Sequence, residues 1–247
     1  MLSAEFDKNL LASINNLNRN VNELIWANVF HDAINGCDWL DKENFSINPG
    51  RWAVGYNYFY VVFRILNECK PKNILETGLG QSSRLIGQYV KTHKACHHDI
   101  VEHDADFVKV SRENFEFSPA SNFNIVSITK MNLKSATGGG VGIVTVYDEK
   151  DFKNVVDGKK FDFISIDGPY GSSPLSRIDL LPYLPQCLNE NFCIVIDDFN
   201  RAGEQNTASL IRQNLTENGI AFRDTVYSGS KDLYLLTSAN SAWLCSL

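Results

Sequence analysis

Short apolar runs that alternate with helical stretches begin after Pro71, and they constrain the fold more than any other feature of this sequence. Each run is rich in Ile, Val or Phe and is bounded by turn formers or by charge. Because the runs are apolar almost throughout, they indicate strands covered on both faces, which belong to a parallel sheet with alternating helices. The five runs are NILETG, HDIVEHD, NFNIVSI, FDFISIDG and FCIVIDD.

Helical periodicity and a terminal hairpin complete this α/β pattern. Apolar residues at helical spacing predict one or two amphipathic helices over residues 3–32. The apolar stretch 52–69 predicts a buried helix that ends at the KPK segment. A further helix over 204–219 closes at Gly219, and the segments IAFRDTVY and DLYLLT then predict a β-hairpin. The glycine run 138–140 has no Gly-Lys-Ser/Thr after it, so we interpret it as a turn within an insertion.

Size and charge narrow the class of protein. A chain of 247 residues that is 44% hydrophobic can bury the core of one domain, or of one domain with a small appendage. The formal charge of -6 and the scattered Lys and Arg residues provide no basic face, so we expect no nucleic acid partner. No apolar run approaches the roughly 20 residues that span a bilayer. We therefore expect a soluble cytosolic protein that does not bind membranes, with its six cysteines reduced.

The segment NILETGLGQSS contains the clearest candidate ligand-binding turn. Ligands of an open parallel sheet bind at the carboxyl ends of its strands, where Glu76 is expected to face the crevice. Gly78 and Gly80 allow close approach of backbone to a ligand, since a Cβ at either position would collide with it. Ser82 or Ser83 is placed to cap the following helix, whose free N–H groups point at the same crevice.

The acids around this turn favour a cationic ligand over a pyrophosphate. The dinucleotide fingerprint has a third glycine where this chain has Ser83. Glu102 ends the second strand at about the distance expected of a strand-helix-strand unit. S-adenosylmethionine suits this arrangement: Glu76 would lie near its ammonium group, Glu102 would accept from the ribose hydroxyls, and His103 would border the adenine. The alternative is that the glycines only form a tight turn.

On these motifs the chain resembles class I S-adenosylmethionine-dependent methyltransferases over about residues 50–238. The resemblance implies a Rossmann-like, mostly parallel seven-stranded sheet with a C-terminal antiparallel hairpin and helices on both faces. It also implies a methyltransferase-like domain over 51–247, preceded by an N-terminal helical extension over 1–50.

Two narrower likenesses appear in FDFISIDGPYGSSPLSRIDLL and CIVIDDFNRAGE. These segments resemble the glucuronoxylan 4-O-methyltransferase family, whose pattern has His where this chain has Asp197. Metal-dependent O-methyltransferases hold a divalent ion with acids after the fourth and fifth strands, and Asp167, Asp197 and Asp198 occupy those positions here. The glucuronoxylan pattern matches this chain at Asp167, Gly168, Pro169, Gly171, Arg177, Asp198, Arg201 and Glu204.

Methyl transfer from a sulfonium to a hydroxyl needs alignment of the acceptor and removal of its proton. Asp167 ends the fourth strand beside the crevice and is the expected base, activated either by burial or by a divalent ion. Asp198 is placed to assist it. Arg177 and Arg201 are expected to bind an acidic acceptor such as a uronic acid, or alternatively to pair only with neighbouring acids. For Asp197 and Asp198 the alternative role is helix capping.

Other features are interpreted as structural. Cys96, His97, His98 and His103 lie close in sequence, but strand neighbours point to opposite faces, so we expect surface or loop histidines and no zinc site. The aromatic row WAVGYNYFYVVF is expected in the core, and Tyr170 near the substrate.

The sequence thus predicts an O-methyltransferase acting on a carbohydrate, such as a polysaccharide, or on another small hydroxylated acceptor. The alternatives are a protein that keeps the fold without catalysis, an aminopropyl transferase and a nicotinamide dehydrogenase. The need for a divalent cation and the oligomeric state, with a homo-oligomer among the options, stay open.

Overall fold

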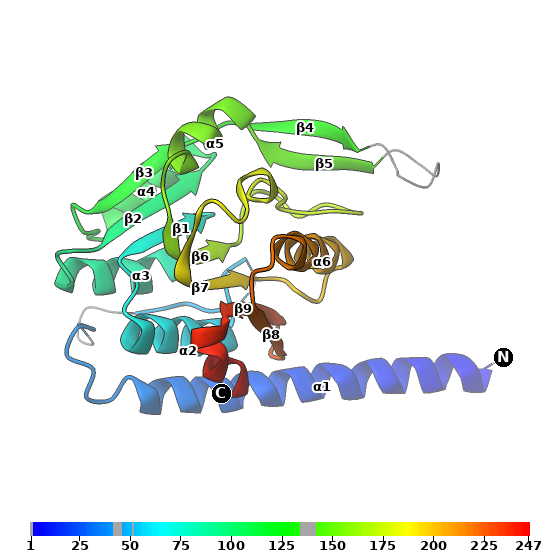
Figure 1. Cartoon of the computed structure of the whole chain (residues 1–247). Helices are drawn as coiled ribbons and strands as arrows, with labels where there is room; N and C mark the ends of the chain where they lie inside the picture. The colour runs from blue at the N-terminus through cyan, green and yellow to red at the C-terminus, as the bar shows by residue number, and fades with distance from the viewer. Residues whose placement is uncertain (1, 42–45, 51, 134–141) are drawn as a thin grey trace.

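The structure is a computed structural model that describes residues 2–41, 46–50, 52–133 and 142–247. Its centre is a seven-stranded sheet with the order β3-β2-β1-β6-β7-β9-β8. The first five of these strands pair in parallel, whereas β9 runs antiparallel to both β7 and β8. The Rossmann-like fold and the C-terminal hairpin predicted from the sequence are therefore confirmed (Figure 1). The strands are β1 (Asn73–Thr77), β2 (His97–Glu102), β3 (Ser121–Ile125), β4 (Ile128–Leu133), β5 (Gly142–Tyr147), β6 (Phe161–Ile166), β7 (Leu188–Ile196), β8 (Phe222–Tyr227) and β9 (Leu233–Ser238).

Helices cover both faces of this sheet. Leu85 and Ile86 of α3 pack in one apolar cluster with residues of α2, while Phe152 of α5 and Ile211 of α6 belong to the cluster on the other face. The helices are α1 (Leu2–Ala33), α2 (Tyr56–Arg64), α3 (Gln81–Thr92), α4 (Ala105–Asn114), α5 (Glu149–Val156) and α6 (Ala202–Glu217), with a π-helical turn at Ile65–Cys69 and 3-10 turns at Leu181–Tyr183 and Ala239–Ser246.

The buried helix predicted over 52–69 begins later than expected. Trp52 is exposed, and α2 starts at Tyr56, after Gly55 in extended conformation. Tyr58 and its neighbours in α2 are buried, so the assignment of this aromatic row to the core is confirmed. Gly219 ends α6 with a positive φ of 69°, as the helix-closing role requires.

The segment between β3 and β6 forms a separate two-stranded sheet of β4 and β5, which stands apart from the main sheet (Figure 1). The insertion predicted there is thus an antiparallel hairpin followed by α5. The glycine run 138–140 lies outside the described residues.

The N-terminal region is one continuous helix, α1, rather than two. It runs beneath α2, and its N-terminal end extends away from the sheet (Figure 1). The predicted helix is confirmed, but its apolar stripe does not face the core, because Leu17 and Leu24 are exposed. The body instead contacts another face of α1 through Trp26 and Phe30. Among the described helices, none is long and apolar enough to cross a bilayer.

Candidate active site

A cavity of about 180 Å³ lies at the carboxyl ends of β1, β2 and β6. The strand order changes direction between β1 and β6, and ligands of open α/β sheets bind at such a switch point. Of the eight residues predicted to bind the cofactor, four line this cavity: Gly78, Glu102, His103 and Asp167. The lining also includes Trp52, Leu79, Tyr147, Gly168, Pro169, Tyr170, Gly171, Arg177, Asp198, Arg201 and Lys231.

The prediction that Glu76 faces this crevice is wrong. Its carboxylate is fully buried and accepts hydrogen bonds from the Ser82 hydroxyl at 2.5 Å and, on its other oxygen, contacts Nε2 of His98 at 3.1 Å. Glu76 lies inside strand β1, so its side chain points to a face of the sheet rather than past the carboxyl end of the strand. His98 is correspondingly buried rather than a surface residue, which corrects its assignment.

Gly80, Ser82 and Ser83 also have structural roles in the described chain. Gly80 is the N-cap of α3, and its N–H donates to the Ser83 hydroxyl at 3.0 Å. Ser83 is thus the third residue of the helix and accepts from the N-cap instead of being the N-cap itself, and both serines are buried outside the cavity lining. Among the residues described, these three close the turn between β1 and α3 rather than reaching into the cavity.

Gly78 allows the backbone of Asp167 and Gly168 to approach closely, whereas the sequence predicted close approach of a ligand. Its φ is +91°, and a Cβ there would lie 3.0 Å from the backbone of both Asp167 and Gly168. The neighbouring turn after β6 therefore fills the space that the missing side chain leaves. A Cβ at Gly80 would have Oγ of Ser82 as its nearest neighbour, at 4.0 Å, so no comparable crowding exists there.

Glu102 occupies the predicted place at the end of β2. One oxygen accepts from the Leu79 N–H at 3.0 Å, and the other from the N–H groups of His103 and Asp104 at 2.6 and 2.9 Å. These bonds hold the turn after β1 against the turn after β2. They also fix the carboxylate at the cavity wall, where the oxygen that accepts from Leu79 keeps acceptor capacity for a ligand hydroxyl.

Three aspartates meet at the tips of β6 and β7. Oxygens of Asp167, Asp197 and Asp198 all lie within 4.8 Å of one another. Asp167 follows the last residue of β6, and the other two follow the last residue of β7. The convergence of these acids agrees with the arrangement expected from the sequence.

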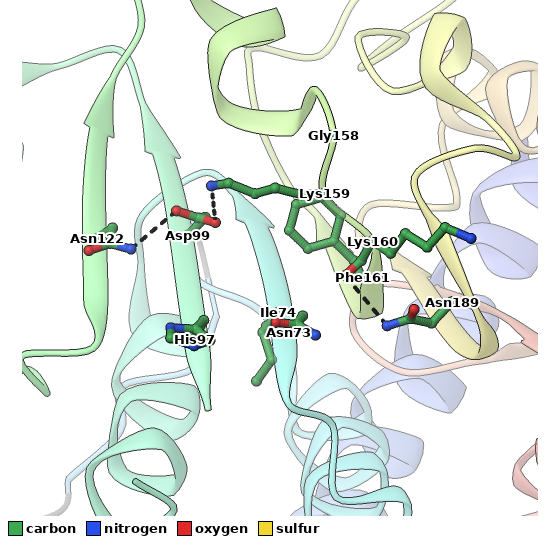
Figure 2. Close-up of a pocket in the computed structure, with 10 residues that line it drawn as sticks. All are labelled: Asn73, Ile74, His97, Asp99, Asn122, Gly158, Lys159, Lys160, Phe161 and Asn189. Carbon is green, nitrogen blue, oxygen red and sulfur yellow. Dashed lines mark hydrogen bonds and ion pairs between the residues drawn. The ribbon is translucent and has the colours of Figure 1, made fainter. Parts of the chain in front are cut away.

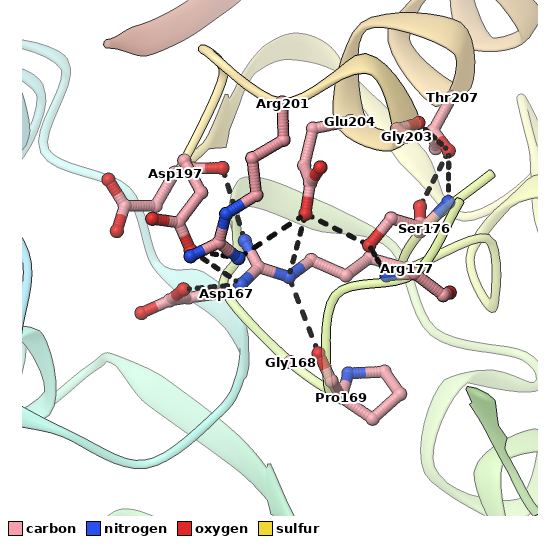
Figure 3. Close-up of polar contacts among 12 residues, drawn as sticks. Asp167, Gly168, Pro169, Ser176, Arg177, Asp197, Arg201, Gly203, Glu204 and Thr207 are labelled. Atoms are coloured by element: carbon pink, nitrogen blue, oxygen red, sulfur yellow. Dashed lines mark hydrogen bonds and ion pairs between the residues drawn. The ribbon is translucent and has the colours of Figure 1, made fainter. Parts of the chain in front are cut away.

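Basic side chains occupy the space between these carboxylates. Arg177 Nη2 lies 3.1 Å from Asp167 and 2.9 Å from Asp198, and Lys231 Nζ lies 3.3 Å from Asp198 and 3.5 Å from Asp197. Figure 3 shows the guanidinium of Arg177 between Asp167 and the side chains of Arg201 and Glu204.

This arrangement does not fit a divalent cation. Mg²⁺ and Ca²⁺ lie about 2.0 to 2.6 Å from their oxygen ligands. An ion at that distance from these carboxylates would lie directly beside the Lys231 ammonium and the Arg177 guanidinium. Their positive charges repel such an ion and already neutralise its ligands. The candidate metal site of Asp167, Asp197 and Asp198 is therefore a salt-bridge cluster in this structure.

Arg177 is not free to bind a substrate, which corrects the prediction for this residue. Its side chain is buried, and it donates to the carbonyls of Pro169 and Asp197 as well as to Asp198. The alternative, pairing with neighbouring acids, describes Arg177. Arg201 also pairs with Asp198 at 2.9 Å, but 45% of its side chain is exposed at the cavity mouth.

Burial separates the proton affinities of these acids. Burial raises the pKa of Asp167 to about 8, outweighing the opposing effect of Arg177. It also raises the pKa of Asp197 to about 6. The pKa of Asp198 is lowered, because the nearby charges of Arg177, Lys231 and Arg201 together outweigh its own burial. The proton affinities of Asp167 and Asp198 are thus separated by their surroundings.

Tyr170 and His103 contact each other at the cavity, with ring centroids 4.8 Å apart and an edge-on orientation. Tyr170 is exposed, as expected for a residue near a substrate, and Trp52 is 93% exposed beside it. Sequence reasoning missed Trp52, Tyr147 and Lys231. Lys231 could have been found, because an antiparallel neighbour of β7 must begin beside the end of β7.

A larger cavity, of about 460 Å³, lies at the amino ends of the parallel strands (Figure 2). Asn73, His97 and Phe161 of its lining are the first residues of β1, β2 and β6. Its acid Asp99 is paired with Lys159 at 2.6 Å. Since ligands of such sheets bind at the carboxyl ends, the smaller cavity is the candidate active site.

Comparisons with known proteins reveal similarity only in structure. No protein-family model matches the chain, and no curated protein matches it in sequence. An O-methyltransferase from Bacillus cereus, solved with S-adenosylhomocysteine, is 12% identical over 89% of this chain and 91% of that chain, with a TM-score of 0.48. A Podospora anserina methyltransferase, also bound to S-adenosylhomocysteine, is 13% identical over 94% and 95%, with a TM-score of 0.48.

Enzymes of another class are also similar. Spermidine synthase from Thermotoga maritima is 15% identical over 68% of this chain and 53% of that chain, with a TM-score of 0.41. By the order and direction of its strands, the chain has the Rossmann-like fold of class I methyltransferases. At identities of 12% to 15%, these similarities concern the fold.

Proposed function

We propose that this protein is an S-adenosylmethionine-dependent O-methyltransferase. The observation that carries the proposal is one cavity at the switch point of the sheet that is lined by Glu102, the turn at Gly78 and Asp167 together. The first two suit the nucleoside of the donor, and the third provides a base next to the place where its methyl group would lie. The chemistry requires these groups at adjacent strand ends, and the fold brings them there.

Glu102 is the residue proposed to bind the ribose. Its carboxylate lines the cavity, and three backbone N–H groups hold it in place, so a ligand would meet an acceptor that needs no reorganisation. Glu76 is too deeply buried to contact the donor's ammonium group directly. It supports the site by fixing the turn through Ser82 instead.

Asp167 is the proposed general base. A methyl transfer forms the oxygen–carbon bond, breaks the carbon–sulfur bond and leaves one acceptor proton, which the Asp167 carboxylate takes up. A carboxyl group whose pKa is about 8 is a far stronger base than an ordinary aspartate. Arg177, at 3.1 Å, orients this carboxylate and keeps a positive charge beside it.

The donor needs more room than the cavity provides in this conformation. Its volume of about 180 Å³ is below the roughly 300 Å³ at which ligand pockets begin. Tyr170 contacts His103 across this space, and its exposed ring has few constraints on moving outward. We propose that the donor's adenosyl group separates these two rings.

The acceptor is proposed to be a hydroxylated molecule that carries a carboxylate, such as a uronic acid within a saccharide. Support comes from Arg201, whose exposed guanidinium lies at the cavity mouth and retains donors beyond those used by Asp198. Trp52 provides an exposed aromatic surface beside it.

Calorimetric titration with S-adenosylhomocysteine, followed by a labelled-methyl assay, tests the function. We expect binding by the wild type and methyl transfer to uronic acids in preference to neutral sugars. Arg201→Ala should raise KM for the acidic acceptor only, because a neutral sugar has no carboxylate to lose. Absence of S-adenosylhomocysteine binding would refute the proposal, whereas binding without transfer to any acceptor would favour the non-catalytic alternative.

A further inference from the structure

The outward face of α1 carries a row of apolar side chains with alternating spacings of four and three residues. We define these five residues as the seam: Leu10, Ile14, Leu17, Val21 and Leu24. Each keeps between 45% and 66% of its surface exposed. This spacing is the heptad repeat of a coiled coil, with the leucines at d and the β-branched residues at a.

The contacts of α1 with the body lie on the side of the helix opposite the seam. Arg19 pairs with Asp232 at 3.1 Å, Glu23 accepts from the Ser230 N–H at 2.9 Å, and Trp26 donates to the Ser228 carbonyl at 2.8 Å. In heptad terms these anchors occupy positions f and c, which face outward in a coiled coil. A helix from another chain can therefore pack on the seam without clashing with the body of the chain that carries it.

We propose that the seam is the interface of a parallel homodimer in which α1 pairs with α1 of a second copy. Ile and Val at a with Leu at d favour two parallel strands. Asn28 occupies the next a position, and a polar residue at one such position sets register and partner number. The seam is thus complementary to itself, which identifies the occupant as another copy of this chain.

The flanking positions contain nothing that would oppose this pairing. Between residues 10 and 28, every e and g position is uncharged: Leu11, Ser13, Asn18, Asn20, Ile25 and Ala27. Identical helices side by side therefore bring no like charges together. Leu11 and Ile25 are themselves more than half exposed and widen the apolar surface.

The area is that of a specific interface. The exposed parts of the seam, together with those of Phe6, Leu11 and Ile25, sum to on the order of 800 Å² per chain, about the area each partner buries in a standard complex. A patch of this size exceeds the roughly 300 to 600 Å² that monomeric proteins usually expose.

Charge argues against a lipid surface as the occupant. Helices that lie on membranes carry Lys and Arg on their polar face. Between residues 9 and 32, Arg19 is the only Lys or Arg in the sequence, and it is paired with Asp232. A membrane is therefore the competing outcome in the experiment rather than the proposal.

Sedimentation equilibrium of the full chain over about two decades of concentration tests the dimer. We expect the wild type to have twice the chain mass of 27.8 kDa. Leu17→Asp should raise the dimer Kd by about a hundredfold or more, because each dimer would bury two carboxylates against each other. The control Asn15→Asp adds the same charge at position b of the same helix, outside the seam, and should leave the mass unchanged.

Two further measurements distinguish loss of pairing from misfolding and confirm the register. The Leu17→Asp variant should unfold on heating and bind S-adenosylhomocysteine as the dissociated wild-type chain does, because the Leu17 side chain faces solvent within one chain. In a parallel pair residue 17 meets its own copy, so Leu17→Cys should form an intermolecular disulfide on mild oxidation, whereas Asn15→Cys should not. A wild type with the mass of one chain at every concentration overturns the proposal, as does flotation of that monomer with zwitterionic vesicles.

Discussion

The tips of β1 and β6 are neighbours in the sheet, and each carries an acid, but the two acids have different surroundings. Glu76 is completely buried and hydrogen-bonded to Ser82 and His98. Asp167 keeps 21% of its side chain exposed, at the cavity. The difference follows from two positions in the register: Glu76 pairs with Ser165 inside the sheet and must point to a face, whereas Asp167 follows the last residue of its strand and points past the strand end.

This comparison teaches that an acid near a strand end is not by that position alone a ligand-binding acid. Asp167 and Asp198, beyond β6 and β7, reach the crevice and require cations to balance them, which Arg177 and Lys231 provide. The acid within β1 instead stabilises the turn that the crevice is built from.

The largest expected effect lies at the β6 tip. Asp167→Asn keeps the shape of the side chain but cannot accept the acceptor's proton, so methyl transfer should fall by about 10² to 10⁴-fold. A labelled-methyl assay measures this loss, and titration with S-adenosylhomocysteine should show affinity close to that of the wild type. A variant that retains a third or more of the wild-type rate would show that Asp167 is not the base.

The next effect is on pH dependence. Asp167 acts as a base only when ionised, and its pKa is about 8, so the rate should rise about tenfold per pH unit below 8 and level off above it. A rate profile between pH 6 and 9, with cofactor and acceptor saturating, measures this slope. A profile that levels off below pH 6 would contradict the raised pKa.

The same raised pKa has a consequence for stability. The folded state binds the Asp167 proton more tightly than the unfolded state, whose pKa is near 3.8. This contribution to stability is complete below the lower pKa and is lost as the pH rises through about 8. Wild type should therefore lose stability relative to Asp167→Asn between pH 5 and pH 8. Denaturant unfolding of both proteins at several pH values measures the difference.

Replacing the acids of the first two strands, one at a time, with alanine sharpens the comparison further. Glu102→Ala should weaken S-adenosylhomocysteine binding by about 1 to 3 kcal/mol, the usual cost of losing charged hydrogen bonds. Glu76→Ala should instead lower the free energy of unfolding by about 1 to 3 kcal/mol, since it leaves buried partners unsatisfied. Calorimetry and denaturant unfolding of both variants measure these two effects. Equal effects of the two substitutions in both assays would contradict the assignment of Glu102 to binding and of Glu76 to stability.

The smallest expected effect is that of metal removal. Because basic side chains already lie among Asp167, Asp197 and Asp198, a chelator should leave the rate of methyl transfer unchanged. Dialysis against EDTA, followed by assay with and without added Mg²⁺, measures this. Loss of activity that Mg²⁺ restores would show that Lys231 moves aside for an ion. In that event Lys231→Met should bind the ion more tightly than the wild type.

The amino-acid sequence by itself determined the sheet and its ends. Strand and helix periodicity are local properties, so the parallel strands, the helix closed by Gly219 and the C-terminal hairpin were all predicted correctly. The positions of Glu102 and Asp167 at strand ends, and the meeting of the three aspartates, followed from the same pattern.

Only the tertiary structure decided which partners these residues have. Glu76 and His98 are 22 positions apart, and Lys231 is more than 30 positions from the acids it neutralises, so neither contact is visible in a local pattern. The same holds for the apolar stripe of α1, whose periodicity predicted a helix but not the side that faces the body. Periodicity reports the conformation of a segment, whereas burial and charge pairing depend on neighbours that the chain brings together only by folding.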